Sequence, residues 1–419
     1  MTSPDPHRAV ETVWRIESAR VIAALARMVN DIGLAEELAQ DALVAALEEW
    51  PRKGVPDNPG AWLTLTARHR ALDRFRRRDT YQRKLQEIGR DMELRQESAE
   101  AELDDALDDH IGDDLLRLIF TACHPALPAE GRLALTLRLL GGLSTAEIAR
   151  AFLVPEPTVG QRISRAKRTL ADRKIPIELP PPAELPVRLA SLLEVVYLIF
   201  NEGYAATSGD DWIRPSLCQE AMRLGRVLAG LMPAEPEVHG LLALMELQAS
   251  RIPARTAPDG TPVLLLDQDR GRWDRLLVRR GLEALRRAEE LGTLGPYGLQ
   301  AAIAACHARA LTPQATDWER IAALYRLLAH LTPSPVVELN RAVAVGMAYG
   351  PARGLEIADG LRDEHALRGY AHLPAVRGDL LARLGRSEEA AAEFRRAAGL
   401  TRNARERDLF LARATALSA

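Results

Sequence analysis

The sequence predicts an all-α protein, and composition and periodicity are the reasons. Aromatic residues make up only 5% of its 419 residues, while the helix-favouring residues Ala, Leu, Arg and Glu are abundant. Strands are usually rich in aromatic and β-branched side chains, so this composition argues against a β-sandwich or a β-barrel. Apolar residues also recur at helical spacing along most of the chain. At this length we expect two to four domains.

Simple counts exclude several classes of protein. Three cysteines are too few and too scattered for a disulfide framework or a zinc site, so Cys123, Cys218 and Cys306 are expected to be buried thiols. No apolar run approaches the ~18 residues that span a membrane. The net charge of −3 conceals strong local segregation. We therefore expect a cytoplasmic protein whose local charges, rather than their total, indicate its function.

The first domain is expected over residues 1–82, as three or four helices. Two prolines and two glycines in residues 53–60 indicate a loop before the third of them. Apolar and aromatic residues recur at helical spacing in this third helix, and we expect them to form its buried face: Trp62, Leu65, His69 and Leu72.

Beyond this domain the charge of the chain changes sign. Residues 83–112 are expected to be an acidic linker, because residues 87–114 hold twelve Asp or Glu against two Arg and have little apolar surface to bury. The next domain, residues 113–175, is basic, with ten Lys or Arg against four acids from residue 115 to residue 174. Five prolines within residues 176–186 then predict a semi-rigid hinge.

A helix-turn-helix is predicted over residues 143–170. Ser144 or Thr145 can cap its first helix. Pro155 and Pro157 mark the turn and open the second helix, where a missing N–H costs least. Two helices joined by a tight turn are typical of DNA-binding modules.

The second helix of this motif has two distinct faces. Its apolar stripe consists of Val159, Ile163, Ala166 and Leu170. The opposite face is polar and basic, with Thr158, Gln161, Arg162, Arg165 and either Arg168 or Thr169. Cations bind phosphates, and Arg and Gln are the side chains that read guanine and adenine edges in the major groove. A solvated basic helix that binds no DNA is the alternative interpretation.

Two helices of the first domain carry opposite charges. The helix that contains Trp62 continues into a run of arginines that suits phosphate binding, although an exposed helix end would look similar. The helix from Ala35 to Trp50 is acidic and includes Glu36, Glu37 and Asp41. DNA would be repelled by this helix, whereas a basic protein surface would be attracted.

Residues 187–419 are expected to form helical repeats. In a tetratricopeptide (TPR) repeat, small residues let two antiparallel helices approach, and an aromatic residue fills the gap to the next pair. Ala342 and Gly354 fit the small-residue positions of one copy, and about three copies are predicted. The last copy is the clearest, with Gly378, Leu381, Gly385, Ala390, Phe394 and Ala397.

The sequence holds none of the common catalytic patterns. It has no His-x-x-x-His pair, no G-x-x-x-x-G-K phosphate loop and no G-x-S-x-G elbow. Cys123 and His124 are adjacent, so on a helix they would point in different directions, and packing is the better interpretation. We therefore expect no enzymatic activity, no cofactor and no metal site.

The order of these segments resembles the extracytoplasmic-function (ECF) group of RNA polymerase sigma factors, in the sigma-70 superfamily. Residues 35–41, Ala-Glu-Glu-Leu-Ala-Gln-Asp, resemble the helix with which that family binds polymerase. Residues 61–76 resemble its −10 helix, with His69 where the family often has Asn. Residues 147–166 resemble its −35 helix-turn-helix.

This resemblance implies three sets of site residues. Polymerase binding would fall to Glu36, Glu37, Gln40 and Asp41. The −10 element would be bound by Asn58, Trp62, Arg68, Arg70, Arg74, Arg76 and Arg77. The −35 element would be bound by Thr158, Gln161, Arg162, Arg165, Lys167 and Arg168.

Three further segments resemble an ECF subgroup with a long TPR-like extension that is thought to regulate activity. They are residues 118–127, residues 201–204 and residues 267–274. The regulatory corner would consist of Asn201, Glu202, Gly203 and Tyr204, with Gly203 ending a helix at positive φ. A helix C-cap with a packed tyrosine is the alternative interpretation.

The resemblance implies an alternative sigma factor. It would bind the clamp and the flap of core RNA polymerase, direct the enzyme to promoter DNA, and be regulated in cis by the extension, which is also a candidate for binding a further protein. A helix-turn-helix regulator with a TPR sensor is a second hypothesis, but it leaves residues 8–80 unexplained. A TPR adaptor is a third, and it leaves both basic helices unexplained.

Overall fold

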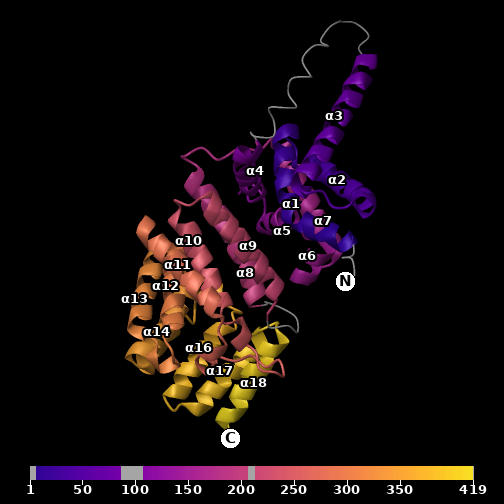
Figure 1. The fold of residues 1–419 in the computed structure, drawn as a ribbon. Coiled ribbons are helices and arrows are strands. Elements are labelled where there is room, and N and C mark those ends of the chain that lie inside the picture. Colours follow the sequence, from indigo (N-terminus) through magenta and orange to yellow (C-terminus); the bar gives the residue numbers. More distant parts are fainter. Residues whose placement is uncertain (1–5, 86–106, 206–212, 419) are drawn as a thin grey trace. The chain divides into compact units, whose positions relative to one another are not determined.

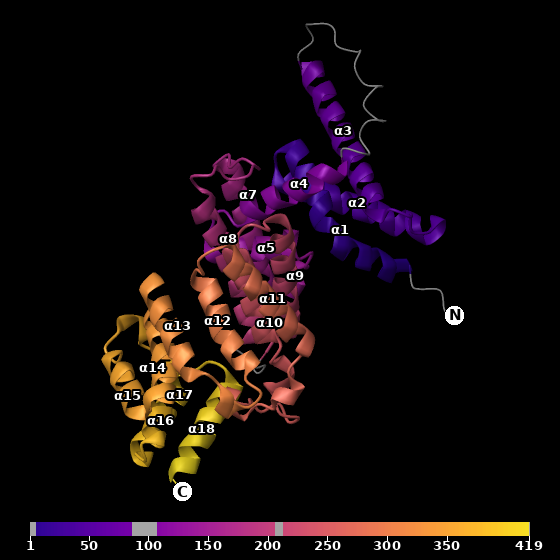
Figure 2. The ribbon, with the colours of Figure 1, turned by 60° about the vertical axis from the view of Figure 1, so that its left-hand side comes forward.

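The computed structural model describes residues 6–85, 107–205 and 213–418. These residues form eighteen α-helices, joined by turns and short 3-10 segments without a β-strand, which confirms the all-α prediction. The chain, drawn from two directions in Figure 1 and Figure 2, divides into two compact units, residues 1–195 and residues 196–419. Within the described residues no helix combines the length and the apolar character needed to cross a membrane.

The N-terminal part of unit 1 is a small helical module. Helix α1 packs against each of the three helices that follow it, and α2 also packs against α3. Ile22 and Leu25 of α1 are fully enclosed by this packing. The bounds of these helices are α1 Pro6–Val29, α2 Ile32–Lys53, α3 Pro59–Leu85 and α4 Leu107–Ala122.

The buried face of α3 is not the one that the sequence predicted. Leu63, Ala67 and Ala71 are buried, whereas Leu65 is 55% and Leu72 is 39% exposed. Alanines face the core because small side chains let α3 approach α1 and α2 closely. The larger side chains therefore form an outward stripe on α3, called the α3 stripe below: Trp62, Leu65, His69 and Leu72.

The C-terminal part of unit 1 contains the predicted helix-turn-helix. Ser144 caps α6 in a capping box, in which its hydroxyl accepts from the backbone N–H of Glu147 at 3.2 Å. Leu153 takes a left-handed conformation, with φ of 50°, in the turn before α7. The apolar stripe predicted for α7 is buried at all four positions. The helices are α5 Ala129–Leu139, α6 Thr145–Phe152 and α7 Glu156–Asp172.

Helix α8 (Leu185–Tyr204) contains the division between the two units. In its first half, Arg188 donates to the carbonyl oxygen of Phe120 at 3.0 Å, and the Ser191 hydroxyl donates to that of Cys123 at 2.8 Å. These bonds satisfy carbonyl groups at the end of α4. The second unit therefore begins at residue 196, later than residue 187, where the extension was expected to start.

Gly203 does not end α8 at positive φ, in contrast to the sequence-based expectation. A Cβ atom at this position would lie 2.7 Å from the backbone nitrogen of Cys218 and 2.9 Å from the carbonyl oxygen of Arg214. Glycine is thus required by the close approach of the chain at the start of α9 (Pro215–Leu231). The neighbouring Tyr204 is half-buried and stacks on Phe200, with ring centroids 5.6 Å apart.

The second unit is built around α10, which is buried on nearly all sides. It contacts α9, α11 and α12, and its residues 240–247 are all buried. A helix that is apolar all round belongs in a core rather than on a surface. The helices of this unit are α9 Pro215–Leu231, α10 Pro236–Ala249, α11 Arg275–Leu291, α12 Pro296–Arg309, α13 Trp318–Leu331, α14 Pro335–Tyr349, α15 Pro351–Gly360, α16 His372–Arg383, α17 Ser387–Leu400 and α18 Ala404–Ser418.

The small-residue positions predicted from the repeat pattern lie where helices cross. A Cβ atom at Gly354 of α15 would lie 2.6 Å from the carbonyl oxygen of Ala342 in α14. In the next pair, a Cβ atom at Gly378 of α16 would lie 3.1 Å from the ring of Phe394 in α17. Phe394 is itself fully buried. The pairs α14–α15 and α16–α17 thus pack as the repeat pattern predicts.

The three cysteines are free and buried, as predicted. Burial raises the pKa of the Cys123 thiol to about 11 and that of Cys218 to about 12, and it also raises the pKa of Cys306. Cys123 lies 3.3 Å from the Thr136 hydroxyl. These thiols are therefore packing groups and not nucleophiles at neutral pH.

Most of the predicted acidic linker lies outside the described residues. Only its two ends are described, and both are helical: residues 83–85 end α3, and residues 107–112 begin α4.

Substitution of Gly354 with Ala should destabilise the second unit. The new methyl group would meet backbone atoms of α14, which cannot move aside as a side-chain end could, so we expect a loss of about 1–3 kcal/mol in the free energy of unfolding. Gly399→Ala in α17 is the control, because a Cβ atom there has no neighbour within 4 Å and should stabilise the helix by up to ~1 kcal/mol. Urea unfolding followed by circular dichroism measures both, and equal effects would contradict the packing argument.

Candidate nucleic-acid and polymerase interface

Two acids of α2 that were predicted to bind polymerase form ion pairs with arginines of α3. Glu37 lies 2.8 Å from Arg74, and Asp41 lies 3.8 Å from Arg70. All four side chains are well exposed to solvent, so each pair contributes at most about 1 kcal/mol. The charges of these two acids and two arginines therefore neutralise each other. Each ion pair can nevertheless be broken and replaced by a new partner at little cost in free energy.

Glu36, one residue earlier on α2, lies in a different environment. It is only 5% exposed and accepts from Arg138 Nε at 2.7 Å and from Gln40 Nε2 at 2.9 Å, and Lys167 also contacts its carboxylate. Burial opposes its ionisation, but Lys167 and Arg138 together hold the pKa of Glu36 below its ordinary value of 4.5. We call these four residues the Glu36 cluster.

The Glu36 cluster joins two sites that the sequence assigned to different partners. Glu36 and Gln40 were predicted to bind polymerase, and Lys167 was predicted to bind the −35 element. Arg138 was not predicted as a site residue. Its signal in the sequence was a single cation inside the apolar segment from Leu135 to Leu140, where a buried charge needs a partner.

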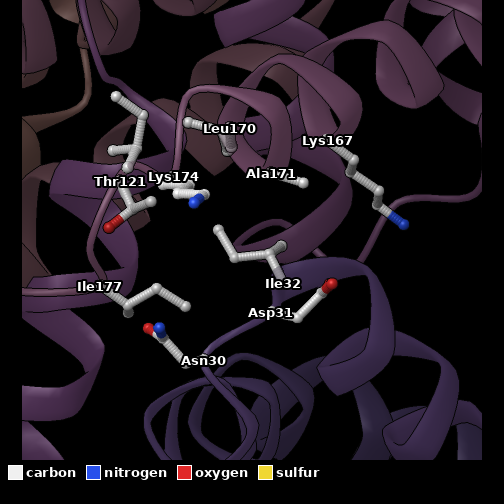
Figure 3. A pocket seen from close by; sticks show the side chains of 10 residues that line it. Asn30, Asp31, Ile32, Thr121, Lys167, Leu170, Ala171, Lys174 and Ile177 are labelled. Atoms are coloured by element: carbon white, nitrogen blue, oxygen red, sulfur yellow. The ribbon is translucent and has the colours of Figure 1, made fainter.

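A cavity of about 270 Å³ lies beside the Glu36 cluster, between the N-terminal module and α7 (Figure 3). Asn30, Asp31 and Ile32 line one side, and Lys167 and Leu170 lie on the other. A contact that contains such a cavity has lost part of the van der Waals packing that a continuous core provides. The charged cluster bridges the two modules beside this cavity, and Arg15 of α1 adds a second ion pair between them, with Glu147 of α6 at 2.9 Å.

The outer face of α7 presents the predicted −35 residues to solvent. Gln161, Arg165 and Arg168 are exposed, and Thr158 and Arg162 are half-buried. Within the part of the chain that the structure describes, none of these arginines forms an ion pair with a carboxylate. This face can therefore meet an external anion without first breaking an internal pair.

The predicted −10 residues do not form one continuous face. The Asn58 side chain accepts from the backbone N–H of Ala61 at 3.1 Å and thereby caps α3. Trp62 packs edge-on against Trp50, with ring centroids 5.4 Å apart. Arg68 is half-buried, and burial together with nearby Arg27 lowers its pKa, so it lies on the inner side of α3.

The remaining −10 arginines lie along the solvent side of α3. Arg70 and Arg74 take part in the ion pairs with α2, and Arg76 lies 4.0 Å from Asp73 of its own helix. The side chain of Arg77 lies outside those that the structure describes. In the described part of the chain, no group of His, Cys, Asp and Glu is arranged to hold a metal ion.

Comparison with known families gives three matches along the chain. Residues 15–81 match the family described as Sigma-70 region 2, and residues 117–170 match Sigma-70 region 4. Residues 188–289 match a family of unknown function, DUF6596.

Two curated relatives extend this result. The chain is 46% identical over 404 residues to an uncharacterized protein of Rhizobium meliloti, a match that covers 94% of each chain. It is 27% identical over 175 residues to a probable ECF RNA polymerase sigma factor, SigI, of Mycobacterium tuberculosis. That match covers 42% of this chain and 59% of SigI.

Substitution of Glu36 with Gln should weaken the contact between the two modules. It leaves Arg138 and Lys167 without their counter-charge, so we expect a loss of about 1–3 kcal/mol in the free energy of unfolding at neutral pH, below the value for a fully buried pair because both partners are partly exposed. Glu37→Gln breaks an exposed pair and should cost about 1 kcal/mol or less.

The same substitution should alter the response to acid. Because the pKa of Glu36 is lowered on folding, its stabilisation is present above the ordinary value of 4.5 and is lost as the pH falls through the folded-state pKa. The difference in the free energy of unfolding between wild type and Glu36→Gln should therefore shrink below that pH. Urea unfolding at several pH values measures it, and a difference that stays constant down to acid pH would show that the Glu36 charge does not hold the contact.

Proposed function

We propose that this chain, which belongs to the extracytoplasmic-function group of the sigma-70 family, binds core RNA polymerase, directs it to promoters, and is regulated by its C-terminal extension. The observation that carries the promoter-binding part is α7, whose apolar side is fully buried while its basic side is left open. Neither a simple helix-turn-helix regulator nor a TPR adaptor would need the match to region 2 over residues 15–81.

Recognition of the −35 element would fall to the outer face of α7. Gln161 and Arg165 are four residues apart, so they lie side by side on the helix. Arg pairs with guanine and Gln with adenine through two hydrogen bonds in the major groove, which makes these two the candidates for reading bases. Thr158, Arg162 and Arg168 would bind phosphates and position the helix.

Binding of the melted −10 element would use the α3 stripe. Exposed aromatic and apolar side chains beside arginines suit single-stranded DNA, because bases stack on the former while phosphates pair with the latter. The ring of Trp62 is held by its edge-on contact with Trp50. The exposed loop before α3, which Asn58 ends as a helix cap, would receive an unstacked base.

Binding of polymerase would use α2, which we propose faces the clamp, while the helix-turn-helix module meets the flap. When Arg70 and Arg74 turn toward DNA, Asp41 and Glu37 lose their partners and become available to a basic surface. One exchange of ion pairs thus couples the two binding events.

The Glu36 cluster makes the described conformation a closed one. Lys167 cannot contact a DNA phosphate while it pairs with Glu36, and Glu36 cannot contact polymerase while it is buried. Binding of polymerase and promoter would therefore require separation of the two modules.

Helix α8 supports regulation by the extension, because it contributes residues to both units. Its first half holds the end of α4 through Arg188 and Ser191, and its last turn carries the predicted regulatory corner. In that corner Asn201 is exposed, whereas Glu202 pairs with Arg214 and Tyr204 is packed. Any docking by this corner would thus depend chiefly on Asn201.

Replacement of Arg165 with Ala should reduce promoter-specific transcription. A lost base contact costs about 1–3 kcal/mol, or roughly 5- to 150-fold in binding, and it relaxes specificity at one position of the −35 element. Arg173→Ala is the control, because this exposed arginine lies just beyond the end of α7. The assay is transcription by purified core polymerase with the variant, on a promoter that core alone ignores.

Two results of that assay would count against the proposal in different ways. Absence of transcription with the wild-type chain on any captured genomic promoter would contradict the sigma function itself. Equal response of Arg165→Ala and wild type to every −35 variant would remove Arg165 as a reader and leave the sigma function standing.

Removal of the extension should change transcription by roughly tenfold or more, because tethering gives the extension a high effective concentration against the sigma modules. The shortened chain should end at Val195 rather than at the proline hinge, so that the half of α8 that holds α4 is kept. Circular dichroism checks that its helices remain. Equal activity of the shortened and full-length chains, at matched folded concentration, would show that the extension does not regulate in cis.

A further inference from the structure

In the segment between α10 and α11 of the second unit, acidic side chains lie at the surface and an arginine lies in the interior. Gln268 and Arg270 are buried, whereas Asp267 and Asp269 are exposed. The acids of the segment serve as caps: Asp269 accepts from the backbone N–H of Gly271 at 2.8 Å, and Asp274 accepts from two backbone N–H groups at the start of α11. Capping thus keeps the carboxylates at the surface, while the arginine points inward.

Arg270 finds only neutral partners inside. Its side chain is buried, with a residue exposure of only 5%. Its guanidinium donates to the carbonyl oxygens of His307 and Ala310, at 2.8 and 2.6 Å, and to the Thr316 hydroxyl at 3.0 Å. Burial and the like charge of Arg251 lower the pKa of Arg270. Burial of this cation is therefore unfavourable, and no carboxylate among the described residues compensates its charge.

A second cation, Arg251, lies against the same interior. Its guanidinium carbon is 5.6 Å from the ring centroid of Tyr204 and 5.9 Å from that of Trp273, and Arg270 lies 5.2 Å from the Trp273 ring. Burial and the charges of Arg251 and Arg270 lower the pKa of His307 to about 3, so this imidazole is neutral at physiological pH. Within the described residues neither Arg251 nor Arg270 forms an ion pair with Asp or Glu.

Several buried hydrogen-bonding atoms around Arg251 and Arg270 have no partner. In the described part of the chain, the buried side-chain atoms without a hydrogen-bond partner include Arg251 Nε, Arg270 Nε and Trp273 Nε1, together with His307 Nδ1 and Gln268 Oε1. The first three can only donate. Buried donors next to uncompensated positive charge call for an acceptor that is itself negative.

We propose that Arg251, Arg270 and Trp273 form a binding site for the oxyanionic group, phosphate or carboxylate, of a small molecule. The unpartnered Nε–H groups of Arg251 and Arg270 and the indole N–H of Trp273 supply three donors for such a group. The flat faces of Tyr204 and Trp273 provide apolar walls beside the anion. This site goes beyond the proposed sigma function, because it concerns the extension alone and can be measured without polymerase or DNA.

Thermal unfolding of the full chain tests the site directly. Inorganic phosphate and acetate are each compared with chloride at matched ionic strength, and at least one of the two oxyanions should raise the midpoint of the transition of the second unit by about 2–4 °C. A response to phosphate alone identifies a phosphate site, and a response to acetate alone identifies a carboxylate site. No response to either oxyanion would overturn the proposal.

Matched variants show whether the response comes from this cluster. Arg251→Gln should abolish the shift, whereas Arg272→Gln, at an exposed arginine of the same segment, should retain it. An equal shift in wild type and Arg251→Gln would overturn the assignment. Trp273→Phe keeps an aromatic ring at this position but lacks the indole N–H, so it should weaken oxyanion binding roughly fivefold, measured as the concentration needed for half of the shift. This second variant keeps the test decisive if Arg251→Gln fails to fold, and an unchanged half-shift concentration would then count against the site.

Discussion

The carboxylate of Glu36 imposes the constraint around which the first unit is arranged. A buried negative charge must be matched by cations, and α5 and α7 supply them through Arg138 and Lys167. That requirement brings the acidic helix of one module against the recognition helix of the other. Breaking the cluster is favourable only if water or a new basic partner takes over the carboxylate. The two modules therefore open most readily when a partner with complementary charge is present.

The sequence predicts a fold best where a helix has one apolar side only. The stripe of α7 was predicted at all four positions because its other side is uniformly polar. On α3 the same method chose the wrong side, since two sets of side chains share the helical spacing and the core took the smaller ones, Ala67 and Ala71. Periodicity measures spacing, whereas the distance between packed helices decides which residues fit between them.

Long-range contacts explain the other differences. Glu36 cannot be told from Glu37 in the sequence, because the partners that bury it lie 102 and 131 residues away. The role of Gly203 also depends on a chain segment that returns to it at Cys218. In the extension, the repeat positions were predictable from small residues, but the inward arginines were not, because the segment between α10 and α11 has no regular period.

The burial of all three native thiols has a practical consequence. Cys123, Cys218 and Cys306 are each enclosed, and burial raises the pKa of each well above neutrality. The thiolate is the form that attacks alkylating reagents, so in the folded protein these sulfur atoms react slowly. One cysteine introduced at an exposed position on each module can thus carry a fluorophore or a spin label without prior removal of the native ones. Separation of the modules becomes measurable as a distance in a chain that is otherwise unchanged.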